Sequence, residues 1–142
     1  MFLRLLMKKD ALKKNNNIIT YGINYLGTCG VHNMKQGFKP GMHAEHDAIR
    51  KLRHLRKKNH LQKISILVIR INKNKKIQAS KPCYDCIQLM NKLPQELGYK
   101  IQNVYYSTNN GDIIKTNLNK LSRENVHLSK YRRILVKRQN KE

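Results

Sequence analysis

The sequence predicts an α/β fold, a three-layer α/β/α sandwich around a five-stranded mixed sheet. Apolar runs typical of strands alternate with stretches of helical periodicity through the middle of the chain. The last two expected strands, 101–107 and 113–116, are separated by the turn signal of residues 109–112. A connection this short can join only antiparallel neighbours, so we expect a hairpin. Because no repeat or Pro/Gly/Ser-rich linker divides the chain, we expect one domain over residues 1–128 and a basic tail over residues 129–142.

The expected elements of the first half follow from local composition. Residues 2–10 suit a short helix, and residues 11–17 suit a brief strand followed by an asparagine turn. The β-branched and aromatic residues of 18–26 predict a strand, and the glycines of 27–41 predict a loop. Residues 43–58 have apolar side chains at spacings of three to four, which predicts a helix with a basic opposite face.

The middle of the chain predicts a buried strand and a second helix. Residues 64–71 are almost continuously apolar, as in a strand that is covered on both faces. Pro82 suits the first turn of a helix that begins near Cys83. Pro94 should end or kink this helix, and Gly98 lies where a C-cap is expected.

The composition points to a polyanionic partner. Lys and Arg number 30 and Asp and Glu number 8, so the formal net charge is +22. Such a charge favours binding to nucleic acid, although it is also compatible with simple solubility. No apolar run approaches the ~18 residues of a membrane span. Two of the three cysteines form a C-x-x-C motif, which suits a metal site in a reducing compartment. We therefore expect a cytoplasmic or nuclear protein with no membrane partner.

Three side chains with metal-binding chemistry lie in two short motifs, His43-Ala44-Glu45 and Pro82-Cys83-Tyr84-Asp85-Cys86. Both motifs are expected at helix N-termini, where exposed N–H groups and the helix dipole favour thiolates. Cys83 and Cys86 are three residues apart and can share one ion on one helix face. His43 completes a set of three ligands, which leaves a tetrahedral Zn²⁺ one position for water, as in catalytic zinc sites. Glu45 can then act as a proton carrier for that water.

The order H-A-E followed by P-C-x-x-C resembles the cytidine deaminase-like superfamily, over roughly residues 11–120 by element order. The resemblance implies a zinc hydroxide that attacks C4 of cytosine, with loss of ammonia to give uracil. It implies His43, Cys83 and Cys86 as zinc ligands and Glu45 as the proton shuttle. It also implies two substrate contacts, one from the Asn24 side chain to the sugar and one from the Ala44 backbone N–H to the base carbonyl.

Two features bear on which branch of this superfamily the chain resembles. The expected terminal hairpin resembles the branch with an antiparallel last pair, which contains nucleoside deaminases and several polymorphic-toxin and RNA-editing domains. Nucleoside deaminases usually have Cys as their first ligand, whereas this chain has His43. Together with the net charge, this favours cytosine in single-stranded DNA or RNA as the substrate. A free nucleotide or nucleoside is the alternative.

A non-catalytic zinc knuckle is the second alternative. Cys29 and His32 form a C-x-x-H that could join Cys83 and Cys86 around a structural zinc ion in a nucleic-acid-binding module. This interpretation leaves His43 and Glu45 without a role, so we favour the enzyme. The sequence does not distinguish DNA from RNA or cytosine from adenine, and it indicates no oligomeric state.

Overall fold

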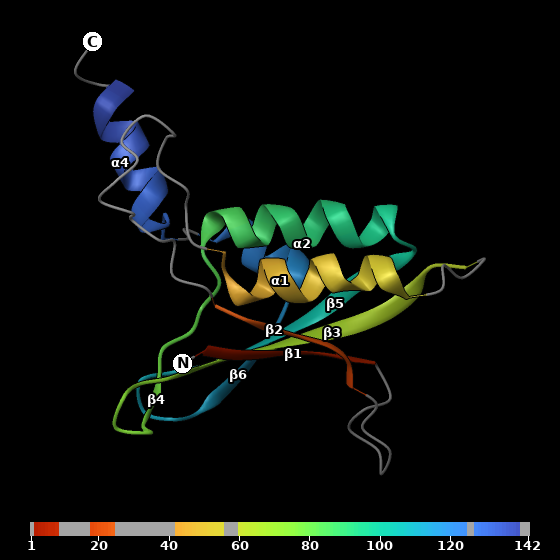
Figure 1. The fold of residues 1–142 in the computed structure, drawn as a ribbon, viewed down its shortest axis with the longest axis horizontal. Helices are drawn as coiled ribbons and strands as arrows, with labels where there is room; N and C mark the ends of the chain where they lie inside the picture. The colour runs from red at the N-terminus through yellow and green to blue at the C-terminus, as the bar shows by residue number, and fades with distance from the viewer. Residues whose placement is uncertain (1, 9–17, 25–41, 56–59, 125–126, 140–142) are drawn as a thin grey trace, which may run out of the picture.

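The computed structural model describes residues 2–8, 18–24, 42–55, 60–124 and 127–139 (Figure 1). Its elements follow one another in the order β1 (Phe2–Lys8), β2 (Ile18–Ile23), α1 (Ala44–Lys51), a 3₁₀ turn (Leu52–His54), β3 (Gln62–Ile71), β4 (Ile77–Gln78), α2 (Tyr84–Glu96), β5 (Tyr99–Ser107), β6 (Ile113–Asn117), α3 (Leu118–Arg123) and α4 (Lys130–Gln139).

The strands form one mixed sheet in the order β2-β1-β3-β5-β6, with the short β4 paired to β3. Strand β1 is antiparallel to both β2 and β3, whereas β3 and β5 are parallel. Strands β5 and β6 form the expected antiparallel hairpin. The prediction of an α/β fold with a mixed sheet is therefore confirmed. The count of five strands is not confirmed, because β4 adds a further short strand to the described sheet.

The described helices α1 and α2 lie side by side over one face of the sheet (Figure 1). Helix α1 contacts β1 and β2, α2 contacts β5, and α3 packs against α2, β5 and β6. No described helix covers the opposite face in this view, so the predicted third layer remains a prediction.

The core lies between these helices and the sheet. Its fully buried large side chains come from α1, α2, α3, the 3₁₀ turn and the two central strands: Ile49, Leu52, Ile64, Ile66, Val68, Ile87, Met90, Val104 and Leu121. The apolar stripe predicted for the first helix is thus its inner face. This packing fixes both helices on the sheet.

The helix expected at 2–10 is wrong, because Phe2–Lys8 is the strand β1. This segment pairs on both sides, with β2 and with β3, so its backbone groups are satisfied by two neighbours. Such long-range pairing outweighs the helix propensity of a leucine-rich stretch, because tertiary contacts readily override local propensity. The expected strand at 11–14 and the expected loop at 27–41 lie outside the described residues.

The helix ends also differ from expectation. Helix α1 ends at Lys51 and continues as a 3₁₀ turn, so it is shorter than the predicted 43–58. Helix α2 continues through Pro94 to Glu96, because a proline so near the end costs only a terminal hydrogen bond. Gly98 follows with φ +82°, the conformation expected of a residue just after a helix. The basic tail contains α4, and in the part of the chain that the structure describes no helix is long and apolar enough to cross a membrane.

Candidate metal centre

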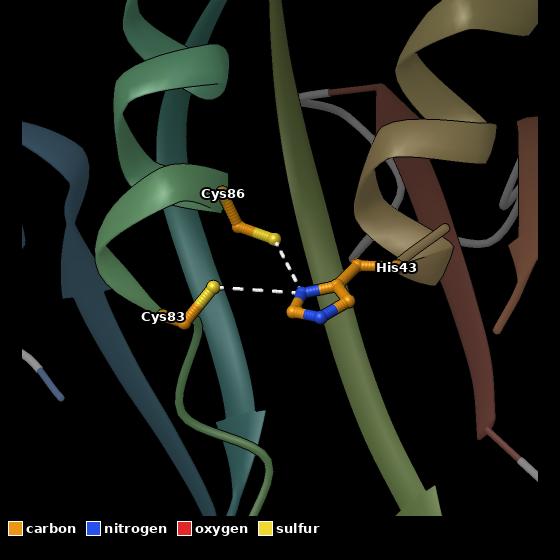
Figure 2. Close-up of side chains that lie close together, drawn as sticks. All are labelled: His43, Cys83 and Cys86. Carbon is orange, nitrogen blue, oxygen red and sulfur yellow. Dashed lines mark hydrogen bonds between the residues drawn. The ribbon is translucent and has the colours of Figure 1, made fainter. Parts of the chain in front are cut away.

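One imidazole and two thiol groups meet where α1 and α2 begin (Figure 2). The Nδ1 atom of His43 lies 3.1 Å from the Sγ atom of Cys86 and 3.5 Å from the Sγ atom of Cys83. The three ligand atoms lie within 4.8 Å of one another, and both cysteines are buried. The structure thus brings together the three residues predicted as ligands, in an arrangement that can hold a metal ion.

The start of each helix gives the cluster its geometry. His43 is the N-cap residue of α1 and Cys83 is the N-cap residue of α2, and both have extended backbones, with ψ values of 148° and 168°. Cys86 lies in the first turn of α2, three residues after Cys83. A residue at an N-cap lies where the N–H groups of the following turn point, which favours negatively charged ligands.

The electrostatics favour a thiolate at Cys83. A hydrogen bond with the Cys86 side chain, aided by His43, lowers the pKa of the Cys83 thiol from 9.0 to about 4, although burial acts in the opposite direction. The thiolate is the form of cysteine that binds metals. The donor chemistry of the cluster therefore fits a soft or borderline metal ion.

Glu45 and Ala44 lie in the first turn of α1, directly after His43, and both are fully buried. Acidic side chains are rarely buried completely unless they have a paired or functional role. Asn24 follows β2 and is half-buried, and its contact with a substrate remains a prediction.

Strand β2 holds α1 in place through polar contacts. The Thr20 hydroxyl donates a 2.7 Å hydrogen bond to the Ala48 carbonyl, and the Asp47 carboxylate accepts a 3.1 Å bond from the Ile23 N–H. Lys51 pairs with Asp47 and donates to the Tyr21 carbonyl. These bonds fix the first turn of α1, and hence His43, relative to the sheet.

Gly22 allows an unusually close approach between β2 and α1. A Cβ atom built at Gly22 would lie 1.9 Å from the Ala44 carbonyl oxygen and 2.5 Å from the Ala48 nitrogen. Only a residue without a side chain fits this contact. The family resemblance implies a role for Asn24, whereas the structure gives a packing role to Gly22, two residues earlier.

A pair of buried serines fixes the segment before Cys83. The Ser80 hydroxyl donates to the Val68 carbonyl at 2.7 Å and accepts from the Ser107 N–H at 2.8 Å. The Ser107 hydroxyl donates to the Gln78 carbonyl at 2.7 Å. The network ties the chain leading into α2 to both β3 and β5. Sequence reasoning missed it, because nothing local distinguishes these serines from surface serines.

The C-terminal segment contacts the first turn of α2. The Tyr84 N–H donates to the His127 carbonyl at 3.2 Å. Asp85 accepts bonds from the Ser129 hydroxyl at 3.0 Å and from the Arg132 guanidinium at 2.7 Å, and this guanidinium also lies over the Tyr84 ring. The basic tail is therefore attached next to the candidate metal ligands Cys83 and Cys86.

The other candidate ligands are placed as follows. His46, His54, His60 and His127 are exposed. Cys29 and His32, the residues of the zinc-knuckle alternative, lie outside the described residues. That alternative is therefore untested by the geometry of the described cluster.

A scan against models of known protein families and a search of curated proteins both found no match. The resemblance to the cytidine deaminase-like superfamily therefore rests on the motif residues of this chain.

Proposed function

We propose that this protein is a zinc-dependent hydrolytic deaminase that converts cytosine to uracil in single-stranded DNA or RNA. The observation that carries the proposal is the meeting of His43, Cys83 and Cys86 at the starts of two adjacent helices, with the buried Glu45 in the same turn that follows His43. This is the residue order and the placement on helices that the family resemblance implies.

The geometry of the ligand atoms supports zinc as the metal. In a tetrahedral site with Zn–N near 2.05 Å and Zn–S near 2.3 Å, the nitrogen and sulfur ligands are separated by about 3.5 Å. The N···S distance to Cys83 is 3.5 Å, which matches this separation, and the distance to Cys86 is 3.1 Å, which must widen for the ion to bind. Three protein ligands leave one position for water, and bound zinc supplies a water molecule whose pKa is about 7.

The residues around the cluster supply the remaining roles. Glu45 accepts a proton from the attacking water and delivers it to the amine that leaves C4, so that cytosine and water give uracil and ammonia. The Ala44 N–H is one of the first-turn N–H groups without a partner inside its helix, and it can donate to the base carbonyl. Asn24, at the end of β2, is proposed to contact the sugar.

The net charge favours a polynucleotide over a free nucleotide. A mononucleotide needs one or two cations near its phosphate, whereas this chain has a surplus of +22. We also propose a cytoplasmic or nuclear location, where reduced cysteines persist.

The test is a deamination assay of the zinc-loaded protein on single-stranded DNA, single-stranded RNA, duplex DNA, cytidine and dCMP. Uracil in the single-stranded polynucleotides, and a loss of about 10²- to 10⁴-fold in rate for Glu45→Gln with zinc still bound, is the expected result. Full activity in Glu45→Gln would contradict the assigned role. Uracil from the monomers alone would favour the nucleoside or nucleotide alternative, and no product from any substrate would contradict the enzyme.

The zinc-knuckle alternative is tested by metal content. We expect His43→Ala to lose zinc, whereas Cys29→Ala and His32→Ala retain one equivalent. The opposite pattern would support a structural knuckle and a binding module without catalysis.

A further inference from the structure

A groove of about 550 Å³ runs between the exposed sides of α1 and α2. The two helices lie side by side over the sheet (Figure 1), and most of the side chains that line the groove are exposed to solvent. Its lining residues recur at helical spacings on both helices: His46, Arg50 and Arg53 on α1 and its 3₁₀ extension, and Asp85, Gln88, Leu89, Lys92 and Glu96 on α2. The α2 residues span about 16 Å of helix axis, which is much longer than one phosphate group.

The groove collects cations from two helices. Arg50, Arg53 and Lys92 form no ion pair with another residue that the structure describes. The acidic Asp85 is already bound to the tail through Arg132, so Glu96 is the remaining acid of the lining. Like charges one turn apart repel each other, and an anion between them relieves this repulsion.

His46 lies at one end of the groove. Its pKa is lowered, first by burial and then by the positive charges of Arg50, His43 and Arg53, with only Asp47 acting in the opposite direction. A neutral imidazole there can still donate one hydrogen bond. His46 is also one helical turn from His43, so this end of the groove is next to the metal centre.

We propose that the groove binds the sugar-phosphate backbone of a single-stranded polynucleotide, with Arg50, Arg53 and Lys92 contacting its phosphates. The inference rests on the proposed polynucleotide substrate and assigns it a path, from the far ends of α1 and α2 to the metal ligands at their beginnings. Guanidinium groups suit this role because they bind phosphate oxygens in pairs. The length of the groove and the spread of its cations favour a polymer over a single phosphate.

The test compares two triple variants with equal charge loss. Arg50→Gln, Arg53→Gln and Lys92→Gln are combined in the groove variant. The control variant combines Lys73→Gln, Lys75→Gln and Lys76→Gln in the exposed turn between β3 and β4. Binding of the zinc-loaded proteins to a fluorescent oligothymidine is measured from 50 to 300 mM salt, because this probe contains no cytosine and binding is separated from catalysis.

Three lost phosphate contacts should lower the slope of log affinity against log salt by about 2 and weaken binding about 100-fold at 0.1 M salt. The control should change affinity only a few-fold, because its charges act at a distance through screening salt. Zinc content and the unfolding midpoint of both variants confirm that they fold. Equal weakening of binding in the two variants would contradict the proposal that the groove binds the polynucleotide. The proposal would also be contradicted if inorganic phosphate competed as strongly as an unlabelled oligonucleotide at the same concentration of phosphate groups.

Deamination by the same variants separates this inference from the proposed function. Activity on a cytosine-containing strand that falls only in the groove variant supports both. If activity is affected equally in both variants, the deaminase proposal is supported and the binding path along the groove is contradicted. If binding depends on the groove but no deamination is seen, polynucleotide binding in the groove is supported and the deaminase proposal is contradicted.

Discussion

The close contact at Gly22 predicts that Gly22→Ala disrupts the metal centre at a distance. The backbone of Gly22 is not in the left-handed region, so alanine is acceptable there on conformational grounds. The obstacle is space, because the new Cβ atom would lie 1.9 Å from the Ala44 carbonyl oxygen and ordinary contact begins at 3.4 Å. The first turn of α1 must therefore move by about 1.5 Å, and it carries His43 with it.

Metal–ligand distances in well-formed sites lie within about 0.2 Å of their preferred values, so a displaced His43 would fit the ion poorly. We therefore expect Gly22→Ala to weaken zinc binding by about 10- to 100-fold, as supporting residues of metal sites typically do. The free energy of unfolding of the metal-free protein should also fall by about 1–3 kcal/mol, which is the usual cost of overpacking. Competition with a chromophoric zinc chelator measures the first quantity, and urea denaturation measures the second.

Gly111→Ala is the matched control. Gly111 has φ +92° in the turn between β5 and β6, and no atom lies within 4 Å of a Cβ atom built there. This variant should lose about 1–2 kcal/mol through backbone strain but keep the zinc affinity of the parent. If Gly22→Ala binds zinc as tightly as Gly111→Ala, the proposed coupling between β2 and the metal centre is refuted.

Two further predictions concern the polar contacts around α2. Ser80→Ala leaves the buried Ser107 N–H without its acceptor, so it should lower the free energy of unfolding by about 1–3 kcal/mol, as measured by urea denaturation. The control is Ser122→Ala at an exposed position, which should change the free energy of unfolding by less than about 0.5 kcal/mol. Equal effects would mean that the buried network is not stabilising. Arg132→Ala removes a largely exposed pair with Asp85, so it should cost less than about 1 kcal/mol and leave zinc binding intact. Loss of zinc in Arg132→Ala would instead make the tail part of the metal-binding domain.

The cluster of His43, Cys83 and Cys86 could be predicted from the sequence because its signals are local. His43 and Cys83 each stand directly before a stretch of helical periodicity, and the spacing of Cys83 and Cys86 by itself places two thiols on one helix face. The terminal hairpin was predicted for the same reason, since residues 109–112 hold the turn chemistry in four consecutive positions. In each case a few neighbouring residues determine the structure.

The features that sequence reasoning missed depend on partners far along the chain. Strand β1 is a strand because β2 and β3 flank it, and no local pattern in Phe2–Lys8 indicates those partners. Gly22 contacts Ala44, which is 22 positions away in the sequence, and Ser80 contacts Val68, which is 12 positions away. Propensity and periodicity carry no information about such contacts.

The strand order explains why the two halves of the metal centre meet. Since β1 is antiparallel to both β2 and β3, the strands β2 and β3 run in the same direction, and β5 runs parallel to β3. Helix α1 thus connects β2 to β3, and α2 connects β3 to β5, and both connections progress the same way across the sheet. Connections of this kind are almost always right-handed, so both helices are placed on one face. Helices α1 and α2 also both begin at the edge of the sheet where the parallel strands have their carboxyl ends. His43 and Cys83 are therefore neighbours at this edge, which is also where the sites of other open α/β sheets lie. The parallel course of β2, β3 and β5 therefore brings the two motifs together at one edge, and β1, which lies between β2 and β3, is the element that the sequence indicates least.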